Sequence, residues 1–245
     1  MSENWTYSLN LSKSFNWNLK ALHELIHIIE NLGFSLKSPY DNKILVFCNT
    51  ESHSIDTTDN LIELIKENPC LLYIFKDDID LFFSLPMFDN QLTKDFKYMD
   101  ISIERVVVFS EDKFNINRDI EKLYIGLIDN FKPISGESHD EVFLELLINN
   151  LLTKKYDNFT DYWDNIVEEK NNLKKPPFLF WLNYFSNDYF DCLTSSQKSF
   201  LLNKSLEIIK LKDGLEIKFF KYPFDYRTSD GLIKMKEINK QWIDI

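Results

Sequence analysis

The sequence predicts an α+β protein with mixed α/β character. Its first half reads as a sheet with packed helices, and its second half reads as helix-rich with one β-hairpin. Short apolar runs alternate with amphipathic segments before residue 133, and helical patterns dominate after it. With 245 residues, 44% of them hydrophobic, the chain can bury one large core or two smaller ones. We therefore expect an α/β layer over residues 1–133 and a helix-rich half over 134–245, either as two domains or as one continuous domain.

The first half alternates strand and helix patterns. Trp5, Tyr7 and Leu9 recur at every second residue, which is the period of a half-buried strand. A helix capped by Ser14 or Asn16 should follow and end near Gly33. The other expected strands are 43–48, 71–75, 79–85 and 98–110, and the other expected helices are 56–68 and 116–131.

The second half begins with a junction loop over residues 132–138. Helices are expected at 141–155, 160–172, 178–190, 195–204 and 232–243. Asp213 and Gly214 lie between two apolar runs, 206–211 and 215–220. Because an Asp-Gly pair tolerates positive φ, this arrangement predicts a hairpin over residues 206–220.

Charge and glycine content exclude several classes of function. The formal net charge is −11, so the chain would repel nucleic acid, and we expect no nucleic-acid partner. Only five glycines occur, and the glycine-rich loops that bind nucleotide phosphates are absent. No apolar run approaches the ~18 residues that span a bilayer, so no membrane association is expected.

The cysteines and the first residues indicate a cytoplasmic protein. Cys48, Cys70 and Cys192 are odd in number, widely spaced and set among apolar neighbours. We interpret them as reduced core residues rather than as a disulfide framework or a zinc site. Residues 1–5 lack the basic start and apolar stretch of a signal peptide.

Residues 23–27 read His-Glu-Leu-Ile-His and resemble the motif of zinc-dependent metallopeptidases, the zincins. Two His four residues apart share one helix face and can hold one zinc, while the Glu activates a bound water. The resemblance implies His23 and His27 as ligands, Glu24 as general base and zinc as cofactor.

An ordinary amphipathic helix explains the same residues without a metal. No third ligand is evident, since nothing distinguishes Glu51, Glu63 or Glu67. At about 100° per residue the apolar and polar side chains separate onto opposite faces. Leu19, Leu22, Leu25, Ile26, Ile29 and Leu32 share one face; Lys20, His23, Glu24, His27, Glu30 and Asn31 share the other. The leading expectation is therefore no catalytic residue and no cofactor, with the zinc site as the alternative.

A second polar cluster surrounds His139. The segment 136–141 could bind a cation or act in acid–base chemistry. It is better explained as the start of a helix near Asp140, because acidic residues favour a helix N-terminus.

Aromatic and acidic residues interleave in the second half and form the predicted partner-binding set. Tyr and Trp anchor protein interfaces, and carboxylates complement a basic partner. The candidate residues are Asp157, Asp161, Tyr162, Trp163, Asp188, Tyr189, Asp191, Asp225 and Tyr226. The alternative is that most of the aromatic rings belong to the core.

In composition the chain resembles immunity proteins of bacterial polymorphic-toxin systems. The resemblance rests on acidity, few glycines, richness in Asn, Lys and Ile, and the segments 213–217 (Asp-Gly-Leu-Glu-Ile) and 222–225 (Tyr-Pro-Phe-Asp). It implies a cytoplasmic, non-catalytic protein that neutralises a cognate basic toxin by covering its active site. A zinc metallopeptidase is the rival interpretation, and a structural subunit of a larger assembly is a third.

Overall fold

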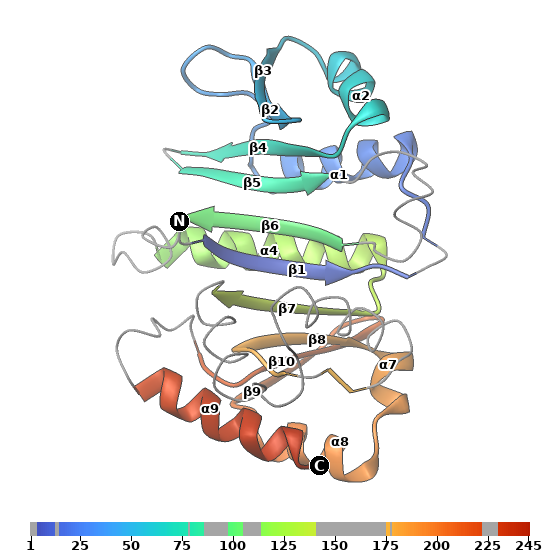
Figure 1. The fold of residues 1–245 in the computed structure, drawn as a ribbon, viewed down its shortest axis with the longest axis vertical. Helices are drawn as coiled ribbons and strands as arrows, with labels where there is room; N and C mark the ends of the chain where they lie inside the picture. The colour runs from blue at the N-terminus through green and yellow to red at the C-terminus, as the bar shows by residue number, and fades with distance from the viewer. Residues whose placement is uncertain are drawn as a thin grey trace. The chain divides into compact units, whose positions relative to one another are not determined.

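The computed structural model describes residues 4–12, 15–77, 79–85, 98–104, 114–140, 175–176, 178–221 and 230–245. It divides into two compact units. Ser8–Lys132 is called the N-terminal unit, and Met1–Tyr7 with Pro133–Ile245 is called the C-terminal unit. Strand β1 (Asn4–Asn10) contributes residues to both units. The described elements combine helices with antiparallel strands, so the predicted mixed α+β class is confirmed (Figure 1).

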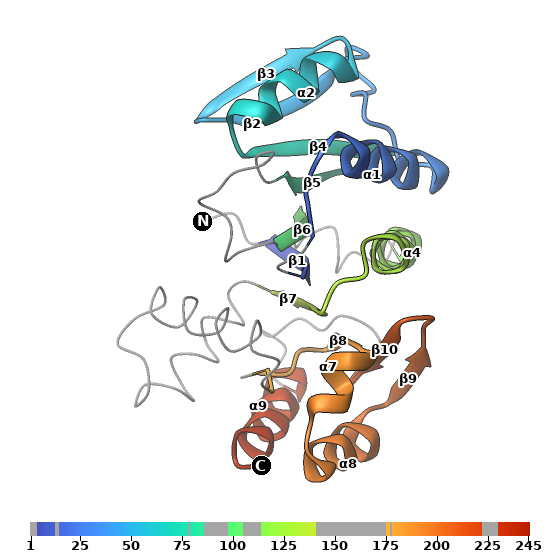
Figure 2. The ribbon, with the colours of Figure 1, turned by 90° about the vertical axis from the view of Figure 1, so that its right-hand side faces the viewer.

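The N-terminal unit contains most of the elements that the sequence predicts. They are α1 (Leu19–Asn31), β2 (Ile44–Cys48), β3 (Glu51–Ile55), α2 (Thr58–Glu67), β4 (Cys70–Lys76), β5 (Ile79–Leu85), β6 (Tyr98–Glu104) and α4 (Phe114–Phe131). Its strands follow the order β3-β2-β4-β5-β6-β1. Alternate side chains of β2, β4 and β5 are buried, as expected of strands with one face on a core. Helices α1 and α4 pack against each other, as Figure 2 shows.

Strand β3 was not predicted, because its sequence Glu-Ser-His-Ser-Ile carries almost no apolar signal. It is an edge strand that pairs only with β2 among the described strands. Asn49 and Thr50 form the two-residue turn between them, both with positive φ (48° and 70°). Positive φ at both central residues is what a tight hairpin turn requires.

Helix α1 begins later than the sequence suggested. Asn18 caps it, since the Asn18 side chain accepts a hydrogen bond from the Ala21 N–H at 3.1 Å. Asn16 therefore does not have this role, and Ser14 lies outside the described residues. Gly33, at φ 78°, follows its end, as predicted. Leu19 was assigned to the buried face but is 45% exposed, because it lies in the first turn.

Cys48 and Cys70 form a disulfide, so the interpretation of reduced core thiols was wrong for this pair. The two residues face each other across β2 and β4, with Cα atoms 4.7 Å apart. That separation lies within the range that a disulfide spans. Cys192 is a free thiol, but it is exposed rather than part of the core.

The C-terminal unit is less helical in its described part than the sequence suggested. It contains β7 (Ser135–Asp140), β8 (Leu182–Ser186), α7 (Asn187–Cys192), α8 (Ser195–Lys204), β9 (Glu207–Lys210), β10 (Gly214–Lys218) and α9 (Asp230–Ile243). With β1, its strands follow the order β1-β7-β8-β10-β9. No described helix in either unit is long and apolar enough to cross a bilayer.

Two strands of this unit replace elements predicted otherwise. Residues 135–140 form β7 and are buried throughout, so they are neither a junction loop nor a helix cap. Residues 178–190 are not one helix: 178–181 have no regular structure, 182–186 form strand β8, and 187–190 begin α7. The predicted helices 141–155 and 160–172 and the strand residues 105–110 lie outside the described residues.

The predicted hairpin is confirmed as β9 and β10, which pair antiparallel. Gly214 is needed there for close packing rather than for positive φ. A Cβ atom on Gly214 would lie 2.3 Å from the Phe185 carbonyl oxygen and 2.7 Å from the Tyr184 ring. Both of those residues belong to β8, which pairs with β10. Any larger side chain at position 214 would therefore push the two strands apart.

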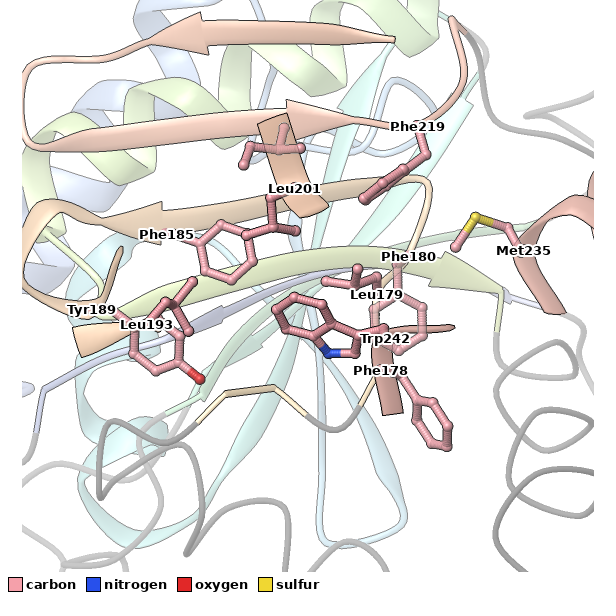
Figure 3. Packing of buried hydrophobic residues seen from close by; sticks show 11 residues of the cluster. Phe178, Leu179, Phe180, Phe185, Tyr189, Leu193, Leu201, Phe219, Met235 and Trp242 are labelled. Carbon is pink, nitrogen blue, oxygen red and sulfur yellow. The ribbon is translucent and has the colours of Figure 1, made fainter. Parts of the chain in front are cut away.

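The core of the C-terminal unit is aromatic (Figure 3). Its buried members are Phe178, Leu179, Phe180, Phe185, Tyr189, Leu193, Leu201, Ile217, Phe219, Met235 and Trp242. Asn239 on α9 lies inside this core and exchanges two hydrogen bonds with the Leu179 backbone, at 2.7 and 2.9 Å. Trp242 donates to the Pro176 carbonyl at 2.6 Å. These polar contacts fix α9 onto the segment before β8.

Candidate functional site

The zincin-like residues lie on the solvent face of α1. Leu22, Leu25 and Ile29 are buried on its inner face, so the helix turns His23, Glu24 and His27 outward. Asn18, Leu19 and Lys20 line a shallow hollow together with these three residues. The structure therefore brings the three motif side chains to one surface, as the spacing predicts.

Neighbours on the same helix already engage two of these side chains. Glu24 forms an ion pair with Lys20 at 3.8 Å, and His27 Nε2 lies 2.8 Å from the Asn31 amide. Within the described ranges, no three His, Cys, Asp or Glu residues group as metal ligands. A metal at His23 and His27 would need its further ligands from elsewhere, and zinc binding stays a prediction.

Helix α7 carries the described part of the predicted partner-binding set. Asp188 and Asp191 are exposed, whereas Tyr189 is fully buried and stacks on Phe185 with ring centroids 5.8 Å apart. Tyr189 therefore anchors the helix instead of lying at the surface, because its position faces the aromatic core. Ser186 caps α7 by accepting a hydrogen bond from the Tyr189 N–H at 3.2 Å.

The remaining members of that set lie outside the described residues. They are Asp157, Asp161, Tyr162, Trp163, Asp225 and Tyr226. Their role in binding stays a prediction.

Polar residues on β7 and β10 are buried. The sequence named His139 as a candidate cation or acid–base residue but gave no sign of its burial, and it did not mark Glu216 or Lys218 as buried. His139 is 5% exposed, and its ring lies 5.0 Å from that of Phe180. Glu216, fully buried, lies 3.3 Å from the ammonium of Lys218. Glu216 and Lys218 alternate with apolar residues along a hairpin strand, a pattern that suggests a face exposed to solvent. The structure shows that both side chains are buried instead.

Comparisons with known proteins identify no family for this chain. No family model matches the sequence, and no curated protein matches it. Among solved structures, the chain is similar to one titled "Pseudomonas aeruginosa T6SS protein PA0821". The two chains are 10% identical with a TM-score of 0.49, over 97% of this chain and 72% of that one.

Proposed function

We propose that this chain is a non-catalytic binding protein that neutralises a basic protein, in the manner of immunity proteins of polymorphic-toxin systems. The observation that carries the proposal is the pair of exposed carboxylates, Asp188 and Asp191, on a helix whose Tyr189 side chain is fully buried in the core. Charges held on a rigid element lose little conformational freedom on binding.

The charge of the whole chain favours a basic partner. At −11 it would accelerate encounter with a protein of opposite charge, and exposed carboxylates would pair with lysines and arginines there. Asp191 already lies 3.9 Å from Lys198, and its side chain is 81% exposed. An arginine from a partner could compete for this carboxylate without breaking the fold.

Co-purification with the products of neighbouring reading frames tests the proposal. A stable complex whose affinity falls with salt is expected. Asp188→Lys with Asp191→Lys should weaken binding on the order of tenfold or more, since each lost charge pair costs about 1 kcal/mol. Glu30→Lys with Glu237→Lys changes net charge equally at exposed sites elsewhere and serves as the control. Failure of every neighbouring product to bind would contradict the proposal.

The compartment in which binding occurs is part of the proposal. The sequence favours the cytoplasm, whereas the Cys48–Cys70 bond favours an oxidising compartment, where disulfides persist. We propose the oxidising compartment, which departs from the cytoplasmic location that the resemblance to immunity proteins implies. Alkylation of thiols in intact cells should label one cysteine of the three before reduction. Labelling of all three would place the protein in a reducing environment instead.

A zinc metallopeptidase is the second candidate, and one observation favours it. His23, Glu24 and His27 line the same surface hollow, as zinc chemistry would require. Stoichiometric zinc in the purified protein, lost in His23→Ala but kept in Lys20→Ala, would support this function. Protein purified in zinc-containing buffer that holds no metal would exclude it.

A further inference from the structure

One face of the sheet in the N-terminal unit reaches the surface. Helices α1 and α4 lie together on one side of β4, β5 and β6, as Figures 1 and 2 show, and the buried side chains of these strands face that side. The side chains between them point the other way. The strand register keeps the two sets apart, since Phe47 lies opposite Leu71 and Leu71 lies opposite Ser84. We call the second set the open face; its members are Leu45, Phe47, Ser52, Ser54, Leu71, Tyr73, Asp80, Phe82, Ser84, Asp100 and Ser102.

The centre of the open face is apolar. Leu71 is 36% exposed, and Leu45, Phe47, Tyr73 and Phe82 are partly exposed. Tyr73 and Phe82 are cross-strand partners whose rings meet edge to face, with centroids 4.7 Å apart. Because each ring holds the other in place, little conformational freedom is left to lose on binding. Aromatic side chains at the surface are common anchors of protein interfaces.

Small polar side chains border this apolar centre. Ser52 and Ser54 border it on β3, and Ser84 and Ser102 border it on β5 and β6. Serine hydroxyls can donate and accept hydrogen bonds at the margin of a contact. An apolar centre with a polar rim is the usual composition of a surface that binds another protein.

The carboxylates of the open face make it negative. Asp80 is exposed and Asp100 is partly exposed, and their places in the register put both on this face. Asp41 adjoins it, since the Ser54 hydroxyl donates to the Asp41 carboxylate at 3.4 Å. The charge of Asp80 reaches the apolar centre: burial raises the pKa of Tyr73, and the Asp80 carboxylate raises it further.

The lysines near these strands do not offset the carboxylates. Lys43, just before β2, pairs with Asp56 at 3.8 Å. Lys37 lies opposite a buried residue of β2 and so belongs to the covered side, and Lys76 pairs there with Asp119 at 2.9 Å. An apolar face edged by carboxylates favours a partner whose apolar residues are flanked by Lys or Arg.

We propose that the open face docks an amphipathic helix of a partner protein, with Lys or Arg along the margins of its apolar stripe. Helices cover apolar sheet faces in layered folds, and a stripe of apolar side chains is the surface they present. The stripe would contact Leu71, Tyr73 and Phe82, and the flanking cations would pair with the carboxylates at the border. The open face belongs to the N-terminal unit and α7 to the C-terminal unit, so this docking does not rest on the proposed function.

Fluorescence anisotropy with a blocked, alanine-based helical peptide tests the proposal on the full chain. The probe carries a stripe of Leu flanked by Lys. Leu71→Lys should weaken its binding on the order of tenfold, because an apolar contact is replaced by a like charge. Ile233→Lys makes the same change at an exposed site of α9 and should bind the probe nearly as well as the parent. Leu71→Ser provides a second variant should Leu71→Lys not fold.

Two altered peptides separate the apolar part of the docking from the charged part. Binding should weaken on the order of tenfold when Ala replaces the Leu stripe, and at least as much when Glu replaces Lys. Asp80→Asn should weaken binding of the probe about threefold, whereas Glu30→Gln removes an equal charge from α1 and should change it little.

Several results would overturn the proposal. They are no binding of the probe, binding of either altered peptide as tight as that of the probe, and equal affinities of Leu71→Lys and Ile233→Lys. Self-association of the parent that is lost in Leu71→Lys would overturn it too, because the occupant of the open face would then be a second copy.

Discussion

The N-terminal unit fastens two of its strands covalently, whereas the described part of the C-terminal unit relies on non-covalent contacts. Cys48 and Cys70 join β2 to β4 and enclose β3 and α2 between them. Cys192, in the C-terminal unit, is exposed and free. The disulfide stabilises its unit mainly by limiting the unfolded chain, while the C-terminal unit depends on how well its interior is packed.

The interiors differ as well. The buried face of α1 is aliphatic, so its contacts require only shape and area. The C-terminal unit also buries polar groups: Asn239, which bonds to the Leu179 backbone, and the pair of Glu216 and Lys218 on β10. Buried polar groups are costly when one partner is lost. Single substitutions should therefore cost more in the C-terminal unit.

Trp242→Ala should give the largest effect. The Trp242 side chain is fully buried, packs on Phe200 at 5.7 Å and donates to the Pro176 carbonyl. Its loss leaves a cavity and an unpaired carbonyl, at a cost of about 4 kcal/mol in the free energy of unfolding. Urea denaturation followed by circular dichroism measures this cost.

Hydrogen exchange of each unit locates that loss. Protection should fall in the C-terminal unit and stay nearly constant in β2 and β4, and Leu25→Ala in the N-terminal unit should give the reverse pattern. Equal loss of protection throughout the chain in both variants would mean that the two units unfold as one. The two units would then not differ in how they respond to a substitution.

Removal of the disulfide should come next in size. The cysteines are separated by 22 residues, and closing a loop of this length stabilises the folded state by about 3 kcal/mol. Cys48→Ala with Cys70→Ala should therefore lower the unfolding free energy of the N-terminal unit, measured in urea. Cys192→Ala is the matched control and should change it little, because that side chain is exposed. An unchanged midpoint in the double variant would show that the bond does not form.

The strands that could be predicted from the sequence are those whose apolar residues alone mark them, and the strands that were missed depend on contacts between distant residues. Strands β4 and β5 were found because apolar runs such as residues 71–75 form strands in almost any context. Strand β7, Ser-Gly-Glu-Ser-His-Asp, was missed because its sequence is polar. Its side chains can be buried because they find partners far away in the sequence: the Trp5 indole, for example, donates to Ser138 at 2.7 Å. In residues 178–186, aromatic side chains fill both faces and leave no period to read.

The candidate sites also differ in whether local spacing is enough to predict them. The exposed face of His23, Glu24 and His27 follows from helical spacing alone. The Cys48–Cys70 disulfide could not be predicted from spacing, because the intervening hairpin and helix bring these two distant residues together. Spacing also could not separate Tyr189 from its exposed neighbours, since the adjacent aromatic and acidic residues 188–191 give no sign of which face meets the core.

A smaller effect is expected at the contact between Lys76 and Asp119. Lys76 on β4 donates to the Leu32 carbonyl at 3.0 Å and pairs with Asp119 on α4 at 2.9 Å. Burial alone would raise the pKa of Asp119, but hydrogen bonds and the charges of Lys76 and Lys122 outweigh it and hold the pKa below its usual 3.8. Asp119→Asn should cost about 1 kcal/mol at neutral pH.

The pH dependence of that cost follows from the lowered pKa. The carboxylate stabilises the fold fully above its unfolded pKa, near 3.8, and this stability is lost as pH falls through the lower folded pKa. The difference between the parent and Asp119→Asn should therefore be constant from pH 5 to 7, in rough terms, and shrink below about pH 4. Denaturation series at several pH values measure it. A difference that grows in acid would contradict this account of Asp119.

The smallest effect is expected at Gly33, which ends α1 in the left-handed region at φ 78°. The nearest atom to an added Cβ is the ammonium nitrogen of Lys76, at the van der Waals distance of 3.7 Å, so no packing clash opposes a side chain there. Gly33→Ala should therefore cost only the backbone strain, about 1 kcal/mol, and Gly33→Asn less, because Asn tolerates positive φ. Thermal denaturation of the two variants separates backbone strain from packing. Equal losses of stability in Gly33→Ala and Gly33→Asn would contradict the strain account, because they would mean that the added side chains clash with a neighbouring residue.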